Sequence, residues 1–278
     1  MTYRDILVHL TEDPRNAART DAALQMARRW DAHLTALYTL PPPQQLYYMG
    51  EYVPAELFQQ QMEEARKKAK AARAAFEEAA ARQSVTCDWI ESDRLPVDAV
   101  EHHGRAFDLL VLGQPDPDPK DPLAVPAGIG VLPHELALRA GRPILAVPYV
   151  GKYPAIGQRV MVAWNGSKEA TRAVHDAMPF LAAAKQVTVF GINPDRSRGT
   201  PGAELARHLA RHGVTVEVAH TVAEDIDAGE ALLSAVADRS ADLLVMGAYG
   251  HARLREMVFG GVTETVLGSM TCPVLLSN

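Results

Sequence analysis

An internal repeat limits the possible folds of this chain more than any other feature of its sequence. Residues 108–113 (DLLVLG) recur as residues 242–247 (DLLVMG). Two further pairs of apolar segments also resemble each other: 143–147 (PILAV) and 273–277 (PVLLS), and 6–8 (ILV) and 160–162 (VMV). Two similar domains are therefore expected in 278 residues, 1–150 and 157–278, with a linker at 151–158 that contains Pro154 and Gly157.

Each copy alternates short, β-branched-rich apolar runs with helical patterns, which is typical of a parallel sheet with helices on both faces. The predicted fold class is α/β, with two tandem Rossmann-like domains whose five parallel strands lie in the order 3-2-1-4-5. The predicted strands are 4–10, 33–39, 85–90, 108–113 and 143–148 in the first copy, and 159–164, 186–192, 214–219, 242–247 and 273–277 in the second.

Helices are expected between the strands. In the second copy they are predicted at 167–184, with Ser167 as N-cap, and at 201–212, 228–239 and 262–270. The first copy is longer because of residues 41–84, which include a charged helix at 54–82 that would extend roughly 40 Å.

Composition narrows the class of function. The formal net charge is -6 and the isoelectric point about 5.9, which argues against a broad nucleic-acid-binding surface. No apolar stretch is long enough to cross a membrane, and no signal peptide is visible. The two cysteines, Cys87 and Cys272, have no ligand-like spacing and are expected in the core of a reduced, cytoplasmic protein.

The second copy of the repeat ends in a glycine pattern suited to binding phosphate. Gly247 and Gly250 are followed, after nine residues, by Gly260 and Gly261 at the start of a predicted helix. Glycines let the backbone approach a ligand closely, and a helix N-terminus favours negative charge. The alternative interpretation is that these glycines are only turn residues.

The expected ligand position is the carboxyl edge of the sheet, where the strand order reverses between the first and fourth strands. In the second copy these strands end at residues 163–165 and at Gly247, so Asn165 would face the glycine loop. Its carboxamide could bind a ribose hydroxyl or a base edge, and the backbone near Ile192 could receive a purine. Asn165 could also be only a turn residue before Gly166, and Trp164 is expected to pack in the core or to lie under a base.

These residues resemble the universal stress proteins, in the tandem type that carries two such domains in one chain. The nucleotide-binding members of that family have Gly-x2-Gly-x9-Gly-Ser/Thr after the fourth strand, and Gly247, Gly250 and Gly260 fit this spacing. Gly261 replaces the Ser or Thr and so removes a hydroxyl while keeping a backbone donor, and Asn165 replaces an acid of the family pattern. Val262 and Thr263 match the continuation, and Thr263 could supply a hydroxyl.

The resemblance implies that the second domain binds ATP or another adenine nucleotide, with Mg²⁺. It also implies that the last strands of the two domains pair, so that the chain forms an intramolecular pseudo-dimer; a further homodimer and an unidentified protein partner stay open. The residues expected at the nucleotide are Ala163, Trp164, Asn165, Ile192, Met246, Gly247, Gly250, His251, Arg253, Gly260, Gly261, Val262 and Thr263.

The first copy departs from this pattern. Residues 114–122 (QPDPDPKDP) are rich in proline, which lacks the N–H groups of a phosphate nest, and their aspartates would repel a polyphosphate. Gly128 and Gly130 could be a remnant of the later glycine pair. A degenerate site is expected here, with a different ligand or a metal at the aspartates as the alternative.

Binding is better supported than catalysis at the second site. The loop has no P-loop lysine, and no nucleophile and base are paired in the sequence. His251 and Arg253 could reach a triphosphate, and Glu256 could touch Mg²⁺, or all three could belong to an exposed polar loop. Three hypotheses follow: an ATP-binding sensor of the stress response, a slow ATPase or phosphotransferase using the same pocket, and an interaction protein whose nucleotide sites have decayed.

Overall fold

The computed structural model describes residues 2–12, 15–40, 55–114, 133–193, 201–223, 225–249 and 261–278. The first half of the chain contains β1 (Asp5–Leu10), α1 (Asn16–Trp30), β2 (His33–Thr39), α2 (Ala55–Arg82), β3 (Cys87–Ser92), α3 (Pro96–Gly104), β4 (Leu109–Gly113), α4 (Pro133–Arg139) and β5 (Ile144–Val147). The second half contains β6 (Arg159–Ala163), α5 (Lys168–Asp176), α6 (Met178–Leu181), β7 (Gln186–Ile192), α7 (Ala203–Arg211), β8 (Val216–Thr221), α8 (Ala228–Asp238), β9 (Leu243–Gly247), α9 (Gly261–Ser269) and β10 (Val274–Ser277).

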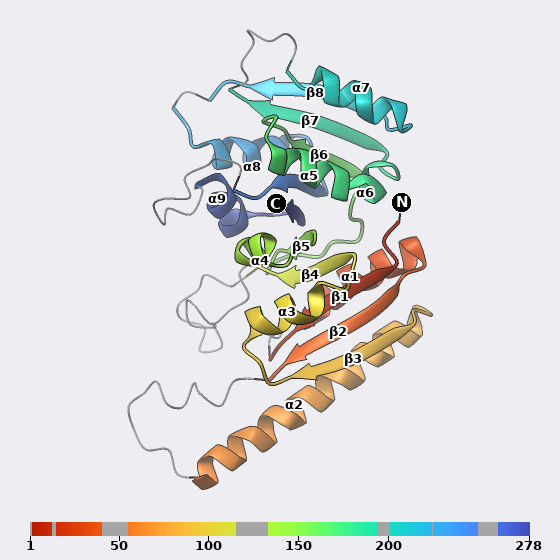
Figure 1. Ribbon diagram of the computed structural model, residues 1–278, viewed down its shortest axis with the longest axis vertical. Coiled ribbons are helices and arrows are strands. Elements are labelled where there is room, and N and C mark those ends of the chain that lie inside the picture. Colours follow the sequence, from red (N-terminus) through yellow and green to blue (C-terminus); the bar gives the residue numbers. More distant parts are fainter. Residues whose placement is uncertain are drawn as a thin grey trace.

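The strands described in the structure form one continuous sheet in the order β3-β2-β1-β4-β5-β10-β9-β6-β7-β8. Neighbouring strands are parallel within each half, and each half has the order 3-2-1-4-5. The halves join where β5 and β10 pair antiparallel, with Leu145 opposite Leu275 (Figure 1). The two expected sheets are therefore one ten-stranded sheet, joined through the last strand of each half.

The core consists of two layers, one on each face of this sheet. Successive side chains of a strand point to opposite faces, so Val160 and Val162 belong to one layer and Met161 to the other. Helices α1, α2, α5, α6 and α7 supply the first layer, whereas α3, α4, α8 and α9 supply the second. Both layers run through both halves, which explains why the repeated strands are apolar at nearly every position.

One prediction about the helices is wrong. The expected single helix 167–184 is two helices, because α5 ends at Asp176 and α6 begins at Met178. Pro179 lies in the first turn of α6, where a proline needs no backbone donor, whereas within a longer helix it would remove a hydrogen bond and clash. The predicted N-cap is confirmed, since the Ser167 hydroxyl accepts a hydrogen bond from Ala170 N at 3.2 Å.

The structure explains the repeated aspartate that precedes the fourth strand of each half. The Asp242 carboxylate accepts hydrogen bonds from the backbone N–H groups of Gly157, Gln158 and Arg159 at 2.8, 2.9 and 3.1 Å. Asp108 accepts the equivalent bonds from Arg4 and Asp5 at 2.7 and 3.1 Å. In each half, therefore, this carboxylate ties the start of the fourth strand to the start of the first.

The segment that joins the two halves is held by Arg29 of α1. Its guanidinium donates to the backbone oxygens of Ile156, Gly157 and Ala183 at 2.8, 3.3 and 3.1 Å, and it lies against the rings of Trp30 and Phe180. Burial lowers the pKa of this guanidinium, and Asp242 partly opposes that shift.

Replacing Arg29 by alanine is expected to lower the free energy of unfolding by about 2 kcal/mol, because three backbone oxygens lose a charged donor. Urea unfolding followed by circular dichroism measures the change. Arg28→Ala, at the exposed neighbouring position, is the matched control and is expected to have little effect. Equal effects of the two variants would contradict the role assigned to Arg29.

Within the described residues, no helix combines the length and apolar character needed to span a membrane.

Candidate functional site

The strand order reverses between β6 and β9, as predicted for the first and fourth strands of the second half. From β6 the chain moves outward to β7 and β8, and it then returns to β9 on the other side of β6. The two strands are parallel, with Val160 opposite Leu243 and Val162 opposite Val245, so both end at the same edge. In open α/β sheets this edge is the usual place for a ligand.

The structure brings several of the predicted site residues to this edge. Ala163 ends β6 and is followed by Trp164 and Asn165, while Met246 and Gly247 end β9. Ile192 ends β7, which is the strand beside β6. Gly250, His251, Arg253 and Gly260 lie outside the described residues, as does Glu256.

Two of these side chains have their main contacts in the core. Met246 is buried in the layer covered by α8 and α9, so only its backbone faces the edge. Trp164 packs against the opposite layer, and its ring lies beside Gly202. The interpretation of Trp164 as a packing residue is therefore confirmed, whereas a contact with a base stays a prediction.

Asn165 is exposed and forms the turn between β6 and α5. Its side-chain oxygen accepts a hydrogen bond from Ser167 N at 3.0 Å, and Gly166 follows it with a positive φ of 75°. Such a turn is typical of asparagine. The structure therefore shows Asn165 as a turn residue. A contact with ribose stays a prediction, and it would use the same exposed side chain.

Gly247 allows β9 to approach helix α5 very closely. A Cβ atom at this position would lie 2.5 Å from the backbone nitrogen of Ala170 and 2.5 Å from the carbonyl carbon of Glu169. No side chain fits in this space. The glycine therefore places the end of β9 against the first turn of α5, where the helix N–H groups begin.

Glu169 is a further residue of this edge that the sequence analysis did not assign to the site. It is 5% exposed, and its Cβ lies against Gly247. Burial alone would raise the pKa of this carboxyl, but hydrogen bonds from its own backbone N–H, Lys168 and Ser167 lower it. The signal in the sequence was an acidic residue directly after the helix N-cap, which also occurs in many helices that bind nothing.

Helix α9 begins at the same site. Gly261 is exposed, and a Cβ atom there would have no neighbour within 4 Å. Val262 is half-buried against the second core layer, and Thr263 is 4% exposed. The start of α9 therefore combines an accessible backbone at Gly261 with the buried Thr263 two residues further on.

The corresponding edge of the first half is filled differently. The side chain of Arg19, which is 5% exposed, lies where a Cβ atom of Gly113 would be, and it donates to His9 O and to Asn16 Oδ1 at 3.3 and 2.9 Å. The predicted aspartate-rich loop and Gly128 and Gly130 lie outside the described residues. Among the described residues, no group of three or more His, Cys, Asp or Glu side chains could hold a metal.

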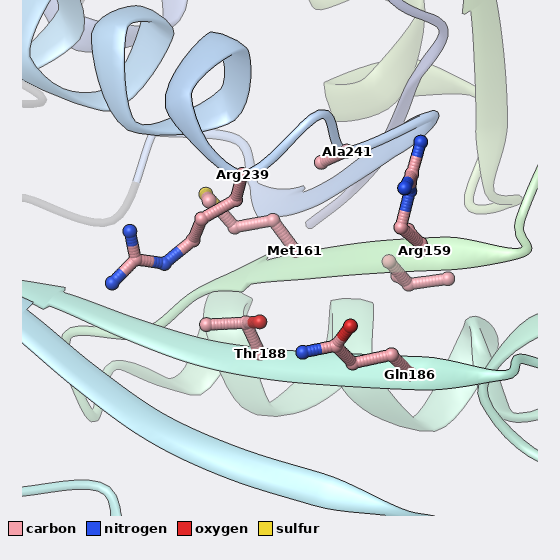
Figure 2. Close-up of a pocket in the computed structure, with 7 residues that line it drawn as sticks. Arg159, Met161, Gln186, Thr188, Arg239 and Ala241 are labelled. Carbon is pink, nitrogen blue, oxygen red and sulfur yellow. The ribbon is translucent and has the colours of Figure 1, made fainter.

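A small hollow lies at the opposite, amino-terminal edge of the second half. Figure 2 shows the side chains that line it, from Arg159 on β6, from Gln186 and Thr188 on β7, and from Arg239 and Ala241 before β9. Its volume of about 20 Å³ leaves room for about one water molecule. It is too small for a nucleotide and is separate from the edge formed by the ends of β6 and β9.

Comparison with known proteins gives consistent results for both halves. The model of the universal stress protein family matches residues 2–125 and 157–278. Universal stress protein Slr1230 of Synechocystis sp. is 27% identical over 187 residues, which are 64% of this chain and 61% of that relative, so the match spans less than two thirds of the relative's length.

Two solved structures share the fold over nearly the whole chain. A universal stress protein from Archaeoglobus fulgidus has a TM-score of 0.70 at 14% identity, with 99% of this chain and 96% of that chain covered. A protein of Pseudomonas aeruginosa, described under the same family name, has a TM-score of 0.62 at 17% identity, with 99% and 93% covered. Because the family model matches most of the sequence in two successive copies, this chain belongs to the universal stress protein family.

Proposed function

We propose that this protein binds ATP with Mg²⁺ at the carboxyl edge of its second half and acts as a regulatory sensor in the cytoplasmic response to stress. In this proposal residues 157–278 form the nucleotide-binding domain. Residues 1–150 form the second member of a pseudo-dimer, with a degenerate site.

One observation carries the proposal: Gly247 and Gly261, at the two ends of the glycine pattern, lie at the edge where the strand order reverses. Gly247 ends β9 at this edge, and Gly261 starts α9 with an open backbone. Gly250 and Gly260 complete the spacing in the sequence. Backbone N–H groups at a helix start are suited to an anion such as a polyphosphate.

The other residues of the edge are assigned to the remainder of the nucleotide. The exposed carboxamide of Asn165 is assigned to the ribose, and the end of β7 at Ile192 to the adenine. Thr263 would support the phosphates, and His251 and Arg253 would reach the triphosphate. The Mg²⁺ ion would be carried mainly by phosphate oxygens, as is usual for nucleotides.

Calorimetric titration of the full chain with ATP, ADP, AMP and cyclic AMP, each with Mg²⁺, tests the proposal. We expect ATP to bind with a dissociation constant in the micromolar range, on the order of −8 kcal/mol. Absence of binding by all four nucleotides would refute the proposal and favour an interaction protein with decayed sites. Steady release of phosphate during the titration would instead indicate a slow ATPase.

Restoring a hydroxyl at position 261 is expected to strengthen ATP binding. A serine fits there without a steric conflict, because a Cβ atom would have no neighbour within 4 Å. One added hydrogen bond to a charged phosphate should lower the dissociation constant about tenfold in Gly261→Ser.

The matched control for this variant is Gly268→Ser, near the other end of the same helix, where a Cβ atom also has no neighbour within 4 Å. Its ATP affinity should equal that of the parent. If Gly261→Ser also binds ATP with the parent affinity, then the start of α9 does not contact the phosphates.

A further inference from the structure

Gln114, which directly follows β4 in the first half, reaches into the second half. It is 5% exposed, and its side-chain nitrogen donates to Leu267 O and Gly268 O at 2.7 and 3.1 Å. Its side-chain oxygen accepts from Tyr149 N at 3.1 Å. The two carbonyl groups belong to the last turn of α9, where a helix has no partners of its own for its C=O groups.

Among the described residues, the second half makes no corresponding contact with the first. In the repeat Ala248 corresponds to Gln114, and both donate their backbone N–H to the last strand of their own half, at Ser277 O and Val147 O. Alanine, however, has no side chain that could reach α4.

Helices α4 and α9, which correspond in the repeat, also differ in how they end. Helix α4 is followed by Gly141 with a positive φ of 62°, which is a common way to end a helix. Thr271 stands in the corresponding place after α9. Helix α9 therefore lacks the glycine that ends α4. Gln114 of the first half caps the C-terminal end of α9 instead.

A second contact from the first half reaches the other side of the glycine pattern. The His134 ring, in the first turn of α4, lies edge-on to the ring of Tyr249, with centroids 6.1 Å apart and planes at 64°. Tyr249 has a positive φ of 60°, which is uncommon for a residue with a bulky side chain, and it directly precedes Gly250. Burial lowers the pKa of His134, opposed by Glu135 and Glu264.

We propose that Gln114 and His134 are positioning residues for the nucleotide site of the second half. They hold the turn at Tyr249 and the helix α9, which are the described segments on either side of the glycine pattern. Fixing these segments before the ligand arrives reduces the ordering that binding requires. The inference rests on the proposed function, and it gives the first half a role although its own site differs.

The coupling is expected in both directions, because an effect of one site on the binding equilibrium of another is reciprocal. Nucleotide bound in the second half should therefore strengthen the contacts of Gln114 and His134. Regulation in this protein would then act through the contact between its two halves.

The test uses Gln114→Met in the full chain, which keeps the length of the side chain and removes both hydrogen-bonding groups. We expect ATP to bind about tenfold more weakly, as is typical of coupling between sites. Without nucleotide, amide hydrogen exchange at residues 266–269 should become faster than in the parent. His134→Ala should weaken ATP binding in the same direction.

The matched control is Gln25→Met. Gln25 also donates to a backbone oxygen of the linker, at Tyr153 O and 2.6 Å, but it belongs to α1, which covers the face of the sheet opposite to α9. Gln25→Met should lose about as much free energy of unfolding as Gln114→Met. Its ATP affinity and its amide exchange at residues 266–269 should equal those of the parent.

Parent-like ATP affinity in Gln114→Met, or equal losses of affinity in the Gln114 and Gln25 variants, would overturn the inference. A parent protein that binds no ATP would overturn the proposed function, and the positioning role with it. The exchange measurement would then still decide whether Gln114 holds the end of α9.

Discussion

Gly247→Ala is expected to lower the free energy of unfolding by about 3 kcal/mol or more. The added methyl group would lie 2.5 Å from two backbone atoms of α5, at Glu169 and Ala170. Backbone cannot move aside as a flexible side chain can, so either α5 or β9 must shift. Because both elements form the edge assigned to the nucleotide, ATP binding should weaken as well. Urea unfolding and calorimetry on the same preparation measure the two effects.

The repeat offers a matched control at Gly113, the corresponding end of β4. A Cβ atom there would meet the Arg19 side chain at 2.9 Å rather than backbone. A flexible side chain can adjust, so Gly113→Ala should cost only about 1 kcal/mol. Neither glycine has a positive φ, so the comparison depends on packing and not on backbone strain. Equal costs in the two variants would show that the approach of β9 to α5 is not the constraint.

Much of the sheet could be predicted because its signals are local and occur twice. Each strand is a short apolar run, and the predicted strands lie within two residues of the observed ones. The repeated aspartates and the glycines at 113 and 247 mark equivalent strand ends. The break at Pro179 could have been predicted from proline chemistry, but the apolar pattern continues through it.

The contacts between the halves could not be predicted in the same way. Gln114 and Leu267 are 153 positions apart, and nothing near either residue indicates the other. Arg19 is similar, because a charged residue on an amphipathic helix is normally expected at the surface, whereas here it fills the edge of the first half. Such features depend on the packing of the whole sheet, which the sequence pattern specifies only indirectly.

The same limit applies to the candidate site. Spacing identified Gly247 and Gly261, and topology predicted Asn165 at the same edge of the sheet, because parallel strands end at a common edge. Glu169 and Gln114 were missed, since their contacts are with residues distant in sequence and are not part of a motif. The motif therefore predicted a position for a ligand. It did not predict which other residues support the backbone around that position.

Gly250→Val and Gly260→Val are each expected to abolish measurable ATP binding, which corresponds to a loss of at least about a hundredfold in affinity, or roughly 2.7 kcal/mol. A branched side chain at either position would block the approach of phosphate oxygens to backbone N–H groups. Calorimetry with ATP and Mg²⁺ measures the loss.

Gly268→Val separates this effect from a general response to valine. It lies in the last turn of α9, with no atom within 4 Å of an added Cβ, so the variant should keep the parent affinity, with a small gain in helix propensity. Unfolding curves should show all three variants folded. If folded Gly250→Val or Gly260→Val binds ATP as well as the parent, the backbone N–H groups at these positions do not contact the phosphates. That result would contradict a nucleotide site at this edge. Loss of binding in both variants, with Gly268→Val intact, would instead locate the phosphates between β9 and the start of α9.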